Sequence, residues 1–219
     1  MTVRDTPQAM LMRAAEKGTP NDIISAVRAG ADINGRNAVG QTALTIATGP
    51  NIGSSESAAR VQCLLGLGAR VAAEDPGCGF GTSVHNSVIN GHRRSLELLL
   101  QADGFLALSA FNSFGQTPLI CAVMAEKVDF IRRLLEAGAP VDARDENTAG
   151  NTALAQAVRQ GNAEIVEMLL SHGADPGLEG WMQLMPLDMV DDLQGTPDSA
   201  AKIRAMLESA LSRRKARFQ

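Results

Sequence analysis

The chain has 219 residues, 45% of them hydrophobic, so it is long enough and apolar enough to bury a packed core. Aromatic residues make up only 3%, with no tyrosine and one tryptophan, which favours close-packed helices over a sheet core. A formal net charge of −4 argues against nucleic acid as a partner, since nucleic-acid-binding domains usually carry a concentrated basic face.

The sequence shows no targeting or membrane segment. Residues 1–8 lack the apolar stretch of a signal peptide, and no later window approaches about 18 consecutive apolar residues. We therefore expect a cytoplasmic protein that makes no membrane contact. Cys63, Cys78 and Cys121 are odd in number and scattered, which fits neither a disulfide framework nor a metal-binding pair. We expect them to be small core residues or unreactive thiols.

One sequence motif recurs along most of the chain. The first copy lacks the opening Thr-Pro-Leu but keeps Ala14-Ala15, Gly18 and the closing Gly30-Ala31-Asp32. A second copy opens with Gly40-Gln41-Thr42-Ala43-Leu44 and contains an inserted loop at 49–56. A third copy is weaker and has Thr82-Ser83-Val84-His85, with Phe80 where glycine opens the other copies.

The fourth and fifth copies are the most complete. They open with Gly115-Gln116-Thr117-Pro118-Leu119 and Gly150-Asn151-Thr152-Ala153-Leu154, 35 residues apart. A sixth copy opens at Met185-Pro186-Leu187, and we predict its second helix over 199–214. The predicted units of a single domain are residues 8–36, 37–77, 78–111, 112–146, 147–180 and 181–214, followed by a basic tail at 215–219.

Each unit is predicted to be a pair of short antiparallel helices, as the fourth copy shows. Thr117 can cap the first helix, and Pro118 suits the first helical position because its missing N–H would be unbonded there. A second helix is predicted over 128–137 with four apolar side chains on one face: Phe130, Ile131, Leu134 and Leu135. Gly138 then ends this helix in the left-handed conformation. One unit cannot cover its own apolar face, so stability is expected to come from stacking.

These residues resemble the ankyrin-repeat family over nearly the whole chain, from about Gln8 to Arg214. The resemblance implies an all-α solenoid of stacked helix-turn-helix units with hairpin tips, in which the terminal units cap the core. It also implies a structural role for His85, which occupies the position of the histidine in the family's Thr-Pro-Leu-His phrase. That histidine makes a hydrogen bond between adjacent turns.

No catalytic, cofactor-binding or metal-binding constellation emerges from the sequence. His85, His92 and His172 fall at three different places in the repeat, and none looks like a ligand or a base. We therefore predict a protein that is not an enzyme and needs no cofactor or metal. The basic run at 213–217 is either a solvated helix end or a contact for an acidic partner or a lipid surface.

The resemblance further implies a binding surface, because turn tips and the outer ends of first helices project from one concave face of an ankyrin stack. Transferred residue by residue, the partner-binding positions are Arg36, Val39, Gln41, Glu74, Phe80, Ile89, Asn90, Phe111, Phe114, Gln116, Met124, Arg144, Glu146, Asn151, Arg159, Gln160 and Trp181. Aromatic and arginine side chains often anchor interfaces, and four aromatic residues fall in these turns. Two of them, Phe80 and Phe111, have an alternative role in folding back over the irregular third unit.

We therefore expect a protein-binding module, an adaptor or inhibitor that holds one partner protein and is a monomer by itself. Narrower versions are a bacterial immunity protein or antitoxin that neutralises a toxin, and an effector that binds a host protein. The remaining alternatives are an enzyme with a small site near 181–196 and a structural spacer.

Overall fold

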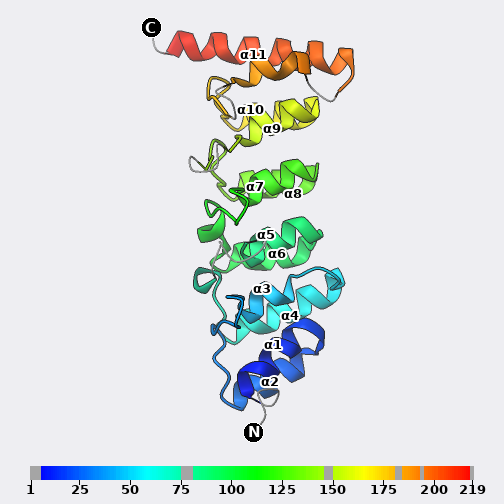
Figure 1. The fold of residues 1–219 in the computed structure, drawn as a ribbon, viewed down its shortest axis with the longest axis vertical. Helices are drawn as coiled ribbons and strands as arrows, with labels where there is room; N and C mark the ends of the chain where they lie inside the picture. Colours follow the sequence, from blue (N-terminus) through cyan, green and yellow to red (C-terminus); the bar gives the residue numbers. More distant parts are fainter. Residues whose placement is uncertain (1–5, 75–80, 146–149, 181–183, 193–194, 218–219) are drawn as a thin grey trace. The chain divides into compact units, whose positions relative to one another are not determined.

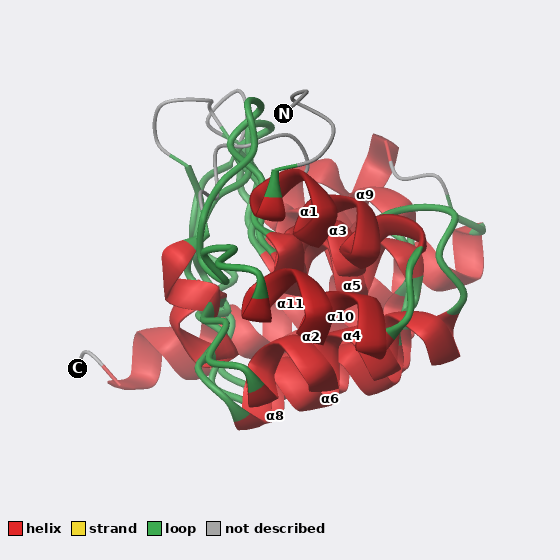
Figure 2. Cartoon of the chain, turned by 90° about the horizontal axis from the view of Figure 1, so that it is seen from below, coloured by secondary structure: helices red, strands yellow, loops and turns green. Residues whose placement is uncertain are grey.

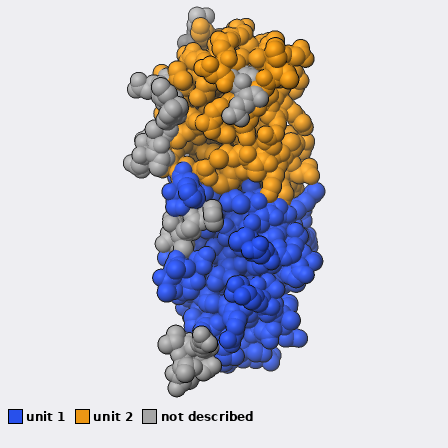
Figure 3. Space-filling model, turned by 45° about the vertical axis from the view of Figure 1, so that its right-hand side comes forward, with its two compact units in different colours: residues 1–114 blue, residues 115–219 orange. Residues whose placement is uncertain are grey.

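The computed structural model describes residues 6–74, 81–145, 150–180, 184–192 and 195–217 of the chain. These residues form α-helices and short 3-10 helices and no strand (Figure 1). The chain divides into two compact units, residues 1–114 and 115–219 (Figure 3). Each unit is built from consecutive helix pairs, which confirms the all-α prediction.

The first unit contains three helix pairs among its described residues. They are α1 (Pro7–Lys17) with α2 (Pro20–Arg28), α3 (Ala43–Ala47) with α4 (Ser54–Gly66), and α5 (Ser83–Asn90) with α6 (Arg93–Gln101). Figure 2 shows the first helices α1, α3 and α5 in one row and the second helices α2, α4 and α6 in another. Two 3-10 helices, η2 (Val71–Ala73) and η3 (Gly104–Ala107), follow α4 and α6 and pack on each other.

The second unit continues the pattern with two regular pairs and a modified last one. The regular pairs are α7 (Pro118–Met124) with α8 (Val128–Glu136) and α9 (Ala153–Gln160) with α10 (Ala163–Ser171). In the last pair a 3-10 helix, η5 (Pro186–Asp192), precedes α11 (Pro197–Arg217). The helix predicted over 199–214 is thus longer at both ends and includes the start of the predicted tail.

Threonine begins the first helix of the regular pairs. The hydroxyls of Thr42, Thr117 and Thr152 accept the N–H of the residue three positions later, at 3.2, 3.3 and 3.1 Å. Pro118 occupies the first turn of α7, and Gly138 follows α8 with a φ of 84°. These observations confirm the local predictions made for the fourth copy. Such predictions are possible from sequence because side-chain caps and left-handed glycines depend on short-range geometry.

The predicted apolar faces of the second helices form the core. In α8, Ile131 and Leu134 are fully buried, and Phe130 and Leu135 are nearly so. Leu169 of α10 and Leu64 and Leu99 of the first unit are fully buried at the corresponding places. The apolar stripe of one helix is therefore covered by the neighbouring pair, as the repeat pattern predicts.

The inserted loop of the second copy is held by the third copy. It lengthens α4 to 13 residues, whereas α6, α8 and α10 have nine each. The His92 ring bridges the two copies, with Nδ1 3.3 Å from the Ser54 hydroxyl and Nε2 3.4 Å from the Gly49 carbonyl oxygen. His92 is buried and serves a structural role.

A buried arginine joins the first two helix pairs. The Arg60 guanidinium, on α4, donates to the carbonyl oxygens of Gly18 at 2.9 Å, Glu16 at 2.9 Å and Ala15 at 3.4 Å. These carbonyls end α1, where no further turn of helix supplies their N–H partners. Arg60 therefore caps a helix of the preceding repeat from outside, and its positive charge suits the negative end of the helix dipole.

Replacing Arg60 by alanine is expected to lower the free energy of unfolding by about 1–3 kcal/mol, because a charged donor to buried carbonyls is lost. Denaturant unfolding followed by circular dichroism measures this loss. Arg28→Ala removes an exposed arginine from the end of α2 and is expected to change stability by less than about 0.5 kcal/mol. Equal effects of the two substitutions would show that Arg60 does not stabilise α1.

Candidate functional site

A tight turn presents Val39 to solvent in the first unit. The Asn37 side-chain oxygen accepts the backbone N–H of Val39 at 3.0 Å and that of Gln41 at 2.9 Å, and the Asn37 N–H donates to the Gln41 carbonyl oxygen at 2.8 Å. Gly40 completes the turn with a φ of 84°, which L-residues avoid. Val39 is 67% exposed at the tip.

The same construction presents Phe114. The sequence Asn112-Ser113-Phe114-Gly115 repeats Asn37-Ala38-Val39-Gly40 in its asparagine, apolar residue and glycine. Asn112 is buried, its side-chain oxygen accepts the Phe114 N–H at 2.9 Å, and Gly115 has a φ of 69°. Phe114 is 60% exposed. The bond to the Asn112 side chain therefore holds the backbone of the turn that presents the Phe114 ring to solvent.

Exposed apolar side chains also stand at the ends of first helices. Ile89 near the end of α5 and Met124 at the end of α7 are both exposed. In the second unit the Gln116 amide donates to the Met124 sulfur at 3.0 Å, and the Cys121 thiol donates to the Gln116 amide oxygen at 3.5 Å. These contacts hold the Met124 thioether at the surface.

Two arginines of the second unit bond to neutral acceptors. Arg159 on α9 is exposed and donates from Nη2 to the Gln156 amide oxygen at 2.7 Å. Arg144 donates from Nη1 to the carbonyl oxygen of Glu179. Each guanidinium keeps further N–H donors beyond these bonds, because arginine carries five.

Two of the predicted partner-binding amides join neighbouring helices. The Asn90 amide donates to the Thr48 carbonyl oxygen at 3.0 Å, and the Gln160 amide donates to the Met124 carbonyl oxygen at 3.1 Å. Both residues end a first helix, and both acceptors lie near the end of the first helix one repeat earlier. The two amides thus hold adjacent first helices in register.

Glu74 does not lie on the surface where the sequence placed it. It is only 6% exposed, and its carboxylate accepts four hydrogen bonds from α3 and α5. Oε1 accepts from the hydroxyls of Thr45 at 3.0 Å and Thr42 at 3.4 Å. Oε2 accepts the Ser83 N–H at 2.9 Å and the Ser83 hydroxyl at 3.0 Å. Glu74 therefore leaves the candidate set, because its carboxylate is used to bridge two repeats.

Burial is the dominant influence on this carboxyl group. It raises the pKa of Glu74 to about 7, against the lowering effect of the hydrogen bonds from Ser83, Thr45 and Thr42. The amide of Asn86 donates to the Thr45 carbonyl oxygen at 3.1 Å and closes the same contact between α3 and α5. Chemistry on a substrate is not open to this group, because protein atoms surround it.

The other candidate residues are distributed as follows. Arg36 is exposed, like Val39, Ile89, Phe114, Met124 and Arg159. Intermediate exposure is found for Gln41, Asn90, Phe111, Gln116, Arg144, Asn151 and Gln160. Phe80, Glu146 and Trp181 lie outside the described residues. Phe111 is thus half-buried, with part of its ring packed and part in solvent.

The sequence interpretation missed one exposed apolar pair. Phe105 and Leu106 of η3 are 56% and 53% exposed. In the fourth and fifth copies the glycine that ends the second helix is followed by a buried alanine, Ala139 or Ala174. In the third copy Asp103 and Gly104 occupy these two positions, and the exposed pair Phe105-Leu106 follows them. The missing helix-ending glycine and the apolar pair after it are the signal that distinguishes the third copy.

The histidines and cysteines have structural surroundings where they are described. His85 is fully buried, and its Nδ1 accepts the Thr82 N–H at 3.2 Å and lies 3.0 Å from the Thr82 hydroxyl. His172 Nδ1 lies 2.8 Å from the Met168 carbonyl oxygen, one turn earlier. Burial raises the pKa of the Cys121 thiol to about 12 and also raises that of Cys63. Both thiols are thus protonated and unreactive at neutral pH; Cys78 lies outside the described residues.

Neither a metal-binding cluster nor a membrane-spanning helix occurs among the described residues. No group of three or more histidine, cysteine, aspartate or glutamate side chains in the described ranges could hold a metal ion. None of the described helices combines the length and the apolar character needed to cross a bilayer.

The fold and the exposed turns define a class of protein, the helical-repeat scaffolds. Residues 84–179 match the family model "Ankyrin repeats (3 copies)". The crystal structure of an ankyrin repeat domain from Acinetobacter baumannii AYE superposes with a TM-score of 0.74 and 26% identity, covering 91% of this chain and 96% of that one. Residues 84–179 are thus ankyrin repeats, and 91% of the chain shares the fold of an ankyrin repeat domain.

Two further similarities concern animal proteins. The human ASB11 ankyrin repeat domain gives a TM-score of 0.67 with 28% identity, covering 91% of this chain and 81% of that one. Mouse Inversin is 34% identical over 107 residues, which are 49% of this chain. The chain spans only 9% of the length of Inversin. Ankyrin repeats in general serve as non-catalytic scaffolds for protein–protein interaction.

Proposed function

We propose that this chain binds a partner protein through its turn tips and the exposed ends of its first helices, as an adaptor or inhibitor without a catalytic step. The observation that carries the proposal is the presentation of Val39 and Phe114 by two turns of the same construction. The turns leave both apolar side chains largely in solvent, 67% and 60% exposed.

Apolar side chains on a fixed turn suit recognition. A turn whose backbone is already held by hydrogen bonds loses little conformational freedom on binding, so more of the burial contributes to affinity. Ile89 and Met124 offer additional apolar area, and Arg159 offers N–H donors for carbonyl or carboxylate groups of a partner. Aromatic and arginine residues are the types that most often dominate interface energies.

The intracellular setting belongs to the same proposal. Cys63 and Cys121 are free thiols, which fits a reducing compartment such as the cytoplasm. We propose that the protein is a monomer there until it meets its partner.

Removing both tips is expected to abolish partner capture. In Val39→Ala/Phe114→Ala, the loss of the Phe114 anchor, about 2 kcal/mol, and of the smaller Val39 contact should weaken binding at least about tenfold. The measurement is affinity capture from a lysate of the source cells, with bound proteins quantified by mass spectrometry. A photo-crosslinking amino acid at position 114 should label the captured protein directly.

The matched control is Phe105→Ala/Leu106→Ala, which removes a comparable exposed apolar area from η3. This variant should capture the same protein to within about twofold of the unsubstituted chain, and a crosslinker at position 105 should leave it unlabelled. Capture by the tip variant at the level of the control, with both variants folded by circular dichroism, would refute the proposed surface.

A further inference from the structure

Positive charge is concentrated at the end of α11. Four of its last five residues, 213–217, are basic, whereas the sixteen residues before them carry two acidic and two basic side chains. Arg213, Arg214 and Lys215 are exposed. This segregation contrasts with the net charge of −4 for the chain as a whole.

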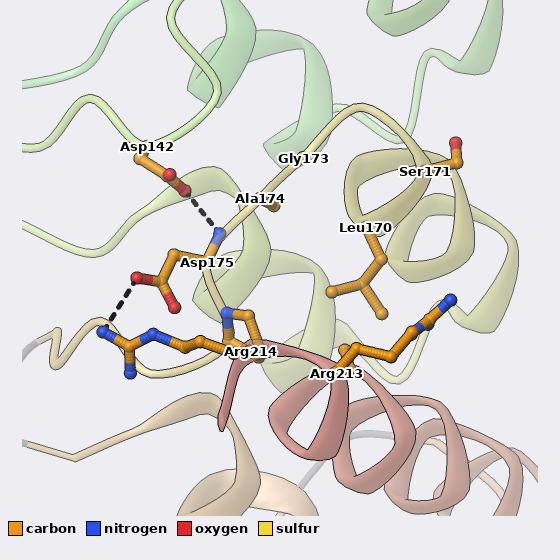
Figure 4. Close-up of a pocket in the computed structure, with 10 residues that line it drawn as sticks. Asp142, Leu170, Ser171, Gly173, Ala174, Asp175, Arg213 and Arg214 are labelled. Carbon is orange, nitrogen blue, oxygen red and sulfur yellow. Dashed lines mark hydrogen bonds and ion pairs between the residues drawn. The ribbon is translucent and has the colours of Figure 1, made fainter. Parts of the chain in front are cut away.

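The basic end of α11 forms one wall of a cavity in the second unit. The cavity has a volume of about 580 Å³ and lies between the end of α10, the following turn and α11. Its apolar wall is made by Leu170, Pro176 and Ala210. Figure 4 shows the side chains of Arg213 and Arg214 leaving α11 in opposite directions along the cavity.

The two arginines differ in their partners. Arg214 Nη2 lies 3.1 Å from the Asp175 carboxylate, so its charge is paired within the protein. Asp175 is in turn placed by its N–H, which donates to the Asp142 carboxylate at 2.9 Å. In the part of the chain that the structure describes, no carboxylate lies within ion-pair distance of Arg213 or Lys215. Among these described residues, the Arg213 guanidinium therefore lies at the cavity without an ion-pair partner, and its N–H donors can bind a carboxylate from another molecule.

We propose that this cavity and the basic end of α11 bind an acidic peptide segment of a partner protein. A carboxylate of the segment binds Arg213, where the fork of N–H donors matches a carboxylate. An apolar side chain next to that carboxylate packs against Leu170, Pro176 and Ala210. This is a second binding surface, and the inference does not depend on the tips formed by Val39 and Phe114.

The chemistry of the cavity favours a peptide over other polyanions. The carboxylates of Asp142 and Asp175 also line it, and Asp175 is paired with Arg214, so the cavity suits one carboxylate at Arg213 better than a continuous run of phosphates such as a nucleic acid backbone. A lipid surface is disfavoured because Ile203 and Leu207 of α11 are fully buried, so the helix packs these apolar side chains inside the protein rather than offering them to a membrane.

The test is fluorescence anisotropy of the full chain with a labelled ten-residue peptide containing four glutamates spaced by leucine and glycine. A matched peptide has glutamine for each glutamate. We expect the glutamate peptide to bind at least about fivefold more tightly, and more weakly as salt rises, because charge pairs are screened. Equal binding of the two peptides would overturn the proposal.

Two variants separate the charge from the cavity. Arg213→Gln/Lys215→Gln should lose at least about fivefold in affinity, whereas the charge-matched Arg28→Gln/Arg132→Gln should stay within about twofold. Ala210→Trp fills the cavity without changing charge and should also lose at least about fivefold, with folding checked by thermal melting. A second filling variant, Ala210→Leu, should lose less than Ala210→Trp.

Equal losses in the two charge variants, or full binding by a folded Ala210→Trp protein, would overturn the assignment. Phosphatidylserine vesicles and a 20-base-pair DNA duplex serve as competing probes. Tighter binding of either probe than of the glutamate peptide, with the same dependence on Arg213, would likewise overturn it. Val39→Ala/Phe114→Ala should retain peptide binding, which separates this surface from the proposed tips.

Discussion

Replacing Glu74 by alanine is expected to lower the free energy of unfolding by about 3 kcal/mol or more. The substitution removes the acceptor of four hydrogen bonds from Ser83, Thr45 and Thr42, all of which remain buried. Unbonded donors inside a protein each cost free energy, and an alanine leaves a void in addition. Hydrogen exchange of α3 and α5 should report the loss locally, since repeats can open independently of one another.

Glu74→Gln is the matched control for this prediction. Glutamine keeps the shape of the side chain, one oxygen acceptor and one donor, so it imitates the protonated carboxyl group. We expect it to retain most of the stability that alanine loses. If the alanine and glutamine variants were equally unstable, the hydrogen bonds would not be the cause.

The same pair of proteins reveals the ionisation of Glu74. Its pKa is about 7 in the folded chain, against 4.5 for an ordinary exposed glutamate, so the folded state binds the proton more tightly. The stabilisation from protonation is complete below pH 4.5 and is lost as pH rises through 7. Relative to Glu74→Gln, the unsubstituted protein should therefore lose about 2–3 kcal/mol between pH 5 and pH 8. If the unsubstituted protein instead became more stable relative to Glu74→Gln as pH rises, folding would lower the pKa of Glu74 rather than raise it.

Leu134→Ala is expected to cost about 2–5 kcal/mol, because the side chain is fully buried in α8 and its removal leaves a cavity. Leu169→Ala in α10 should cost a similar amount for the same reason. Both leucines lie in the second unit, so denaturant unfolding with hydrogen exchange of α7 to α10 measures their effects on one body.

Arg159→Ala is the control for the leucine substitutions. Its side chain is exposed, and its hydrogen bond to Gln156 lies at the surface end of α9. Its removal should change stability by less than about 0.5 kcal/mol. A loss above about 2 kcal/mol from Arg159→Ala would mean that this exposed side chain stabilises the fold as much as a buried leucine does.

The helices were predictable from the sequence because their determinants are local. Thr117 and Pro118 start a helix, Gly138 ends one, and the apolar spacing between them identifies the buried face. The same reasoning gave too short a last helix, since the basic residues after 214 continue α11 without a stop signal. Helix ends depend on such signals, and the chain has none between Arg214 and Arg217.

Glu74 and Arg60 were not predictable in the same way, because they join different repeats. Thr42 and Thr45 lie 32 and 29 residues from Glu74, and the carbonyls that Arg60 caps lie 42 to 45 residues from it. A signal for Glu74 nevertheless exists. Thr45 and Ser83 stand where the fourth copy has Ile120 and Pro118, so polar side chains occupy positions that are buried elsewhere in the chain. A buried hydroxyl needs a partner, and a nearby acidic residue can supply it.

The exposure of the proposed binding positions was predicted in part. Val39 and Phe114 follow from the turn sequence Asn-x-x-Gly, whose hydrogen bonds are short-range. Asn90 and Gln160 occupy the predicted place at helix ends, but their amides bond to the preceding repeat. The position of a residue within the repeat predicts where along a helix or turn its side chain lies. It does not tell which side-chain donors already bond to a carbonyl oxygen of the neighbouring repeat.

The contacts between the second and third copies limit how this chain could be rearranged by exchange of repeats. Glu74, Asn86, Asn90 and His92 each bond to the other copy of this pair. A transplant or duplication of either copy alone would separate a buried carboxylate, two amides and an imidazole from their partners. The second and third copies therefore have to be moved together, and Arg60 of the second copy also needs the end of α1 in the first copy.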